Sequence, residues 1–448
     1  MTTTASPTAL KRQFGLLTAV AMIVGQVIAV GIFLTPAGMA RSVGSPFWLL
    51  LIWIVIGAMT LSGALCYGEL ASRFPSAGGS YVYLREAYGP ATAFLYGWMN
   101  LLVLDPGLTA TLAVGLSEYA SFLIPLSAGQ KLVVAIATIL LLGSVNILGA
   151  RLSANFLKGL TALKVGTLIF IIGYGFLGRF GDASNFTPFI SRPDDVFGAL
   201  AGGVVGAFFA FAGWWEVSRI AGEIKDAERN LPRALIIGTL IITTIYILTS
   251  AVFFYLVHPS RVANDQAFAA QAGEIMFGPL GGKIFAAVVV LSVAGSILAY
   301  LMASPRVYYA MARDGLFINA IGRLHPRFGT PHLATLIQMA LAVILVLSGS
   351  FEQIISYFFF VVVFFVAMAV AGLFRLRKQP HVGYTTWLYP LTPIFFLLVT
   401  AVVLMLIAAR NPLQTILGVA VTLAGLPVYY LIFSRNKSSN GVDKDNRI

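Results

Sequence analysis

The stretch AMIVGQVIAVGIFLTP at residues 21–36 decides the fold class, because two glycines and a proline interrupt an apolar segment. A second interruption, GAFFAFAGWWE at residues 206–216, lies five apolar spans later and ends on a charge. Irregular backbone at membrane depth is tolerated only where it lines a cavity or is buried in protein. Paired broken helices at matching positions of two halves indicate a transporter binding site. The alternative is that these glycines only permit close helix packing.

The composition excludes a soluble globular protein. Hydrophobic residues make up 58% of the 448 residues and charged residues 10%, whereas soluble domains carry about 25% charged residues. A spanning helix needs roughly 20 mostly apolar residues. About twelve spans are predicted, near residues 14–40, 46–71, 90–124, 130–150, 155–178, 196–222, 232–257, 280–312, 332–350, 353–374, 387–409 and 412–433.

These spans predict an all-α membrane protein with a single transmembrane domain over residues 1–435. The first span is too long for a signal-peptide core, so we expect it to remain in the mature chain. The first five spans cover residues 14–178, the next five cover 196–376, and a last pair covers 387–433. Residues 436–448 form a polar tail that we expect to be cytoplasmic.

The basic residues predict the orientation. With the N-terminus inside, the inner segments carry 21 Lys and Arg residues and the outer segments carry 7. This asymmetry agrees with the positive-inside rule, so both termini are expected in the cytoplasm of a cell inner or plasma membrane. The net charge of +12 is scattered over the inner loops without a basic stripe, so a nucleic-acid partner is not expected.

The broken helices suit an α-amino acid. Half-helix N-termini offer free N–H groups and the positive end of a dipole to a carboxylate. Half-helix C-termini and unwound carbonyls accept hydrogen bonds from an ammonium group.

Four stretches carry a family resemblance over roughly residues 20–380. They are GIFLTP at 31–36, YGELASRFPSAGGSYVYLREAYGP at 67–90, FAFAGW at 209–214 with RNLPRA at 229–234, and PRVYYAMARDG at 305–315. With these stretches the chain resembles the amino acid–polyamine–organocation superfamily, and most of all the sodium-independent L-type amino acid transporters. The resemblance implies a five-plus-five inverted repeat with discontinuous first and sixth spans.

The resemblance also implies the substrate site. The carboxylate would meet main-chain N–H groups around Val30, Gly31 and Ile32, and the ammonium would meet carbonyls around Ile28, Phe209 and Ala212. Phe209 would close the site from outside, although an ordinary apolar aromatic is the alternative. The implied substrate-binding residues are Ile28, Ala29, Val30, Gly31, Ile32, Phe209, Ala210, Ala212, Gly213, Trp215 and Glu216.

The chain departs from the family pattern at both breaks. Ala29 and Val30 stand where relatives usually have Gly-Ser, and the larger side chains narrow the main-chain cradle. Trp215 and Glu216 stand where carriers of large neutral amino acids have an amide and then an aromatic. Substrate identity is therefore left open by the resemblance.

Ionisable residues inside the membrane are functional candidates. Lys164, midway along the fifth span, matches a lysine of the L-type relatives. In those relatives the lysine occupies the place that a sodium ion has in sodium-coupled transporters of the superfamily. A fixed ammonium there would bridge the first and eighth spans, while the alternative is a lysine that snorkels to the interface. Glu69 resembles a family position near the inner end and is expected to be structural or gating.

Two carboxylates in the spans have several possible roles. Asp105 precedes Pro106 in the third span, and Glu216 follows the second break. Either could pair with Lys164, accept a proton during transport or receive a cationic substrate. The alternatives are a structural pair for Asp105 and a salt bridge from Glu216 to Arg219, three residues later.

Other chemistry is not indicated. No phosphate-binding loop of the form GxxxxGK[ST] is present in the sequence, so ATP is not expected to drive transport. No metal, cofactor or enzymatic constellation is predicted, because the four histidines lack ligand spacing: His258, His325, His332 and His381.

The resulting prediction is a sodium-independent exchanger or facilitator of small or neutral L-amino acids that works by alternating access. The alternatives are a proton-coupled symporter of amino acids, cationic amino acids or polyamines that uses Asp105 or Glu216, and a membrane amino acid sensor that transports nothing. No obligatory heavy subunit is expected beside the substrate and the lipid bilayer.

Overall fold

The computed structural model describes residues 9–29, 31–191, 196–258, 267–349 and 351–433. Within these residues, ten segments are long and apolar enough to cross a membrane, and α1 and α14 are shorter apolar helices. The helices are α1 (Leu16–Val27), α2 (Gly31–Val43), α3 (Pro46–Arg73), α4 (Ser80–Tyr88), α5 (Pro90–Met99), α6 (Asp105–Leu123), α7 (Ala128–Leu148), α8 (Ala150–Leu177), α9 (Val196–Phe211), α10 (Ala227–Leu256), α11 (Ala267–Phe277), α12 (Gly281–Ala303), α13 (Pro305–Arg313), α14 (His332–Ser348), α15 (Phe351–Leu376), α16 (Leu391–Arg410), α17 (Pro412–Leu423) and α18 (Gly425–Val428).

The twelve predicted spans correspond to these helices. The first span is α1 and α2 with a break between them, and the sixth is α9 followed by the 3₁₀ helix η3 (Trp214–Glu223). The third span joins α5 to α6 through a π-helical turn, η1 (Asn100–Leu104). Pro106 lies two residues after the end of this turn, and a proline removes a backbone donor, so the ordinary α-helical ladder cannot run through it unchanged.

The structure differs from the prediction at some helix boundaries and in two loops. α10 begins at Ala227 and not near residue 232, because Pro232 lies close enough to the N-terminal end that the helix continues through it. The predicted loops 72–89 and 258–279 contain the short helices α4 and α11. Both helices are shorter than a membrane span, so a count based on span length passes over them.

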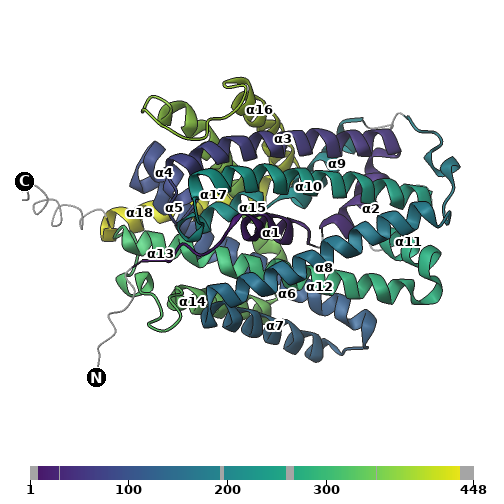
Figure 1. Ribbon diagram of the computed structural model, residues 1–448, viewed down its shortest axis with the longest axis horizontal. Coiled ribbons are helices and arrows are strands. Elements are labelled where there is room, and N and C mark those ends of the chain that lie inside the picture. The colour runs from purple at the N-terminus through teal and green to yellow at the C-terminus, as the bar shows by residue number, and fades with distance from the viewer. Residues whose placement is uncertain (1–8, 30, 192–195, 259–266, 350, 434–448) are drawn as a thin grey trace, which may run out of the picture.

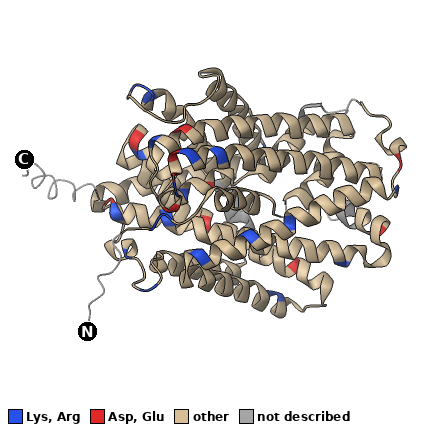
Figure 2. Cartoon of the chain, in the orientation of Figure 1, with Lys and Arg blue, Asp and Glu red and all other residues tan. Residues whose placement is uncertain are grey.

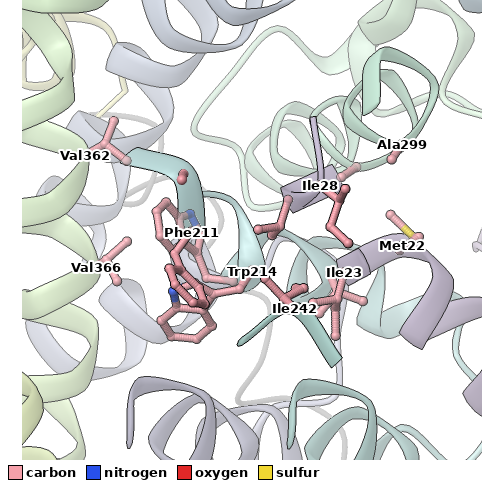
Figure 3. Close-up of a cluster of buried hydrophobic side chains, with 14 of the residues drawn as sticks. Met22, Ile23, Ile28, Phe211, Trp214, Ile242, Ala299, Val362 and Val366 are labelled. Atoms are coloured by element: carbon pink, nitrogen blue, oxygen red, sulfur yellow. The ribbon is translucent and has the colours of Figure 1, made fainter. Parts of the chain in front are cut away.

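The two broken helices lie together inside the bundle. α1 lies in its middle and contacts α8, α10, α12 and η3, while α2 packs along α9 (Figure 1). A buried apolar cluster joins the first break to the second and includes residues from α1, α10, α12 and α15 (Figure 3). The breaks are therefore enclosed by protein, as irregular backbone at membrane depth requires.

The first and last described residues lie at the same end of the bundle (Figure 1). Lys and Arg residues gather toward this end, and few lie at the opposite end (Figure 2). An even number of passes explains why the first and last described residues share an end.

Candidate functional site

The first break leaves free backbone donors. α1 ends at Val27, Ile28 has φ −74° and ψ 84°, and α2 begins again at Gly31. The N–H groups of Gly31 and Ile32 are in the first turn of α2, where no helical carbonyl can accept from them. Val30, predicted to contribute to this cradle, lies outside the described residues.

The second break depends on a glycine. α9 ends at Phe211, and Gly213 has φ +101° in the left-handed region, which other residues rarely adopt. The N–H of Ala212 donates to the carbonyl of Phe209 at 3.1 Å. The chain then continues as η3, which is buried along most of its length.

The two breaks touch each other. A Cβ added to Gly31 would lie 3.0 Å from the Cα of Ala210, so a side chain at this point would require α2 and α9 to move apart. The buried Tyr246 of α10 connects the same segments, since its hydroxyl lies 3.0 Å from the Val27 carbonyl and 2.9 Å from the Ala210 carbonyl. Its ring packs edge-on against Trp53 and Phe211.

Lys164 joins the first span to the eighth. Its buried ammonium donates to the carbonyl of Gly25 at 2.8 Å, to the carbonyl of Ile28, and to the Ser296 hydroxyl of α12 at 3.3 Å. The Ser296 hydroxyl also donates to the Gly25 carbonyl at 2.8 Å. The predicted bridge is therefore present, and the snorkelling alternative is wrong. The Ile28 carbonyl, expected to meet the substrate, already accepts from Lys164, and the Ser296 hydroxyl lies 3.5 Å from it.

Neither predicted carboxylate pairs with Lys164. Arg219 of η3 donates to Asp105 at 3.0 and 3.1 Å, and it forms a salt bridge with Glu216. All three side chains are at most 2% exposed. The salt-bridge alternatives for Asp105 and Glu216 therefore describe the structure, and their pairing with Lys164 is wrong.

Four further polar residues complete this charged cluster. Two of them form hydrogen bonds with Arg219, and two form hydrogen bonds with Asp105. Tyr96 and Asn100 accept hydrogen bonds from Arg219, and the hydroxyls of Tyr300 and Tyr308 donate to Asp105. The cluster ties the third and eighth spans to η3 just beyond the second break.

Phe209, the predicted gate, is 45% exposed although it lies in α9 beside the break. Its ring packs edge-on against Phe359 of α15, with 5.5 Å between ring centroids. One turn earlier, Gly206 lines a cavity of about 480 Å³ between α2 and α9, together with Thr35 and Gly202. Phe209 is thus close to open space toward the end opposite the first and last described residues.

At the end of the bundle where the first and last described residues lie, hydrogen bonds and ion pairs hold separate segments of the chain together. The N–H groups of Gln13 and Phe14 donate to the Glu223 carbonyl at 2.8 and 2.9 Å, which ties the segment before α1 to the end of η3. The Glu223 carboxylate pairs with Arg306 at 2.7 Å.

Two more contacts hold this end together. The hydroxyl of Tyr81 in α4 donates to Asp314 at 2.8 Å. Burial and the neighbouring Asp314 raise the pKa of Tyr81, so its hydroxyl stays protonated and available as a donor. Glu69 is buried and accepts from Arg73 and Arg377 at 2.9 and 2.6 Å, which agrees with the predicted structural role.

Sequence comparison identifies the family. A family model described as amino acid permease matches residues 14–432. The chain belongs to the amino acid permease family. This permease is 31% identical to the serine/threonine exchanger SteT of Bacillus subtilis, over 96% of its own length and 98% of that protein. It is 30% identical to the human cystine/glutamate transporter, over 96% of its own length and 86% of that protein. It is 31% identical to the rat large neutral amino acids transporter small subunit 2, over 94% of its own length and 81% of that protein.

The family places this permease among membrane transporters and not among enzymes. Among the described residues, no group of three or more His, Cys, Asp and Glu side chains could hold a metal ion. The residues that sequence reasoning passed over are Tyr246, Ser296 and Gln26. Each has an apolar residue or a glycine on either side in the sequence, and a polar residue of this kind carries no recognisable spacing.

Replacing Tyr246 with phenylalanine should raise the KM of this permease about three- to tenfold, since one neutral hydrogen bond contributes about 0.5–1.5 kcal/mol. The ring contacts with Trp53 and Phe211 would remain, while the two breaks lose their shared donor. The concentration dependence of amino acid exchange measures this. Tyr88→Phe is the matched control, because its hydroxyl donates to the Met368 carbonyl at 2.9 Å, away from the breaks. An equal KM change in both variants would contradict the prediction.

Proposed function

We propose that this permease exchanges small neutral L-amino acids across the membrane, without sodium, by alternating access. The observation that carries the proposal is the ammonium of Lys164, which joins α1 to α12 where a mobile cation could otherwise do so. A fixed charge makes the contact permanent, so loading a sodium ion is unnecessary. The names of the relatives support exchange, since one of them is a serine/threonine exchanger.

The proposed substrate site lies at the two breaks. The amino acid carboxylate meets the N–H groups of Gly31 and Ile32 at the positive end of α2. The ammonium meets carbonyls near Ile28, Phe209 and Ala212, and Phe209 covers the bound molecule from the side of the cavity. The contact between Gly31 and Ala210 leaves little room, which favours a small substrate.

The charged cluster argues against the proton-coupled and cationic alternatives. Asp105 accepts hydrogen bonds from Arg219, Tyr300 and Tyr308, and Glu216 is paired with Arg219. Each carboxylate therefore has a partner inside the protein, and the two share one guanidinium. A cationic substrate would have to displace Arg219, at the cost of leaving a guanidinium buried without a partner.

The remaining parts of the proposal concern the surroundings of the transporter. We place it in a cell inner or plasma membrane with both termini in the cytoplasm, in agreement with the distribution of Lys and Arg. Residues 1–435 act as one transport domain with residues 436–448 as a tail, and no heavy subunit is required. The contacts around Glu223 then close the cytoplasmic side, while the cavity between α2 and α9 faces outward.

Replacing Lys164 with methionine tests the role of the fixed cation. Hydrogen bonds to charged groups contribute about 1.5–3 kcal/mol each, so the exchange rate should fall about 10- to 100-fold. Lys158→Met is the matched control, because it removes a partly exposed lysine from the same helix. Exchange by wild type should be equal in sodium and in potassium buffers. A sodium-dependent wild type, or a Lys164→Met variant with the wild-type rate, would contradict the proposal.

A further inference from the structure

Gln26 is a buried amide without a partner in the described part of the chain. It lies in the last turn of α1, and its side chain is 8% exposed. Neither its Nε2 nor its Oε1 makes a hydrogen bond there. An unsatisfied buried polar group costs about 1–3 kcal/mol, so both atoms of this amide are expected to find a partner during the transport cycle.

The position of Gln26 indicates where a partner for its amide would lie. A Cβ added to Gly213 would be 3.5 Å from its Cγ and 3.8 Å from its Nε2, so the amide lies against the second break. The neighbouring residues of α1 face elsewhere: Gly25 lies against Thr161 of α8, and Ile23 lies against Gly238 of α10. Gln26 therefore belongs to the face of α1 that looks onto the substrate site proposed above.

We propose that Gln26 recognises the side chain of the transported amino acid and selects a hydroxyl or carboxamide group. A carboxamide offers both donors and an acceptor, and a hydroxyl can accept from Nε2 or donate to Oε1. An aliphatic side chain would leave both atoms of Gln26 unsatisfied. A charged side chain would bring the larger cost of burying a full charge into the site. This inference rests on the proposed function and names its substrate class, small polar neutral amino acids.

Threonine and valine have nearly the same shape and differ by the hydroxyl, so they isolate the effect of Gln26. The experiment measures how each inhibits the exchange of radiolabelled serine in proteoliposomes that contain the full-length protein. Wild type should bind threonine about tenfold more tightly than valine. In Gln26→Met the ratio should fall close to one, while Gln26→Asn, which keeps the amide, should retain part of the preference.

Gln338→Met is the matched control, because it also removes a buried glutamine. Its Nε2 already donates to Thr109 at 3.3 Å, and it lies in α14, away from the breaks. This variant should keep the wild-type ratio. A wild-type ratio near one, or a ratio unchanged by Gln26→Met, would overturn the inference. If the protein exchanges aliphatic amino acids but not serine, the inference about Gln26 is wrong and the proposed exchange function is retained. If it exchanges no amino acid, both proposals are wrong.

Discussion

Replacing Gly31 with leucine should abolish amino acid exchange, with a loss of roughly 100-fold or more, since a displacement of about 1 Å at a reacting site costs that much. The reason is backbone contact. A Cβ at residue 31 would lie 3.0 Å from the Cα and 3.2 Å from the Cβ of Ala210, and leucine adds three further carbons. α2 must then move away from α9, which separates the N–H donors of the first break from the carbonyls of the second.

Gly166→Leu is the control for this prediction. It makes the same substitution at an exposed position of α8, where a Cβ would meet nothing within 4 Å. The exchange rate per amount of monodisperse protein should be close to wild type in Gly166→Leu and near background in Gly31→Leu. Normal exchange by Gly31→Leu would show that the substrate does not bind between the two breaks.

Replacing Arg219 with methionine should destabilise the protein by about 3–5 kcal/mol, the usual cost of removing one partner from a buried ion pair. Arg219 is the shared partner of Asp105 and Glu216, so both carboxylates would be left buried without a counter-charge. Thermal unfolding in detergent measures the effect as a lower midpoint temperature. The exposed Arg323 provides the control, because Arg323→Met should leave the midpoint unchanged.

Two further variants separate charge from geometry at this cluster. Arg219→Lys keeps the charge but cannot reproduce the planar fork of donors, so its midpoint should lie between wild type and Arg219→Met. The triple variant Asp105→Asn, Glu216→Gln, Arg219→Met removes all three charges and should recover part of the loss. A wild-type midpoint in Arg219→Met would mean that the cluster contributes nothing to stability.

The spans and both breaks could be predicted from the sequence, because length, hydropathy and glycine placement are local properties. The bridge made by Lys164 was also predictable, because the resemblance to L-type transporters implied it. The pairing of Asp105 with Arg219 was not, because the two residues are 114 positions apart and no local pattern relates them. The short helices α4 and α11 were not predicted, because each is shorter than a membrane span.

Counterflow in proteoliposomes is the most direct test of sodium-independent exchange by this permease. Radiolabelled serine uptake should be measured into vesicles that are empty or preloaded with unlabelled serine, with and without inward sodium and proton gradients. If the permease is a sodium-independent exchanger, uptake should require internal serine and should be the same under every gradient. Uptake into empty vesicles that is driven by sodium or proton entry would contradict it.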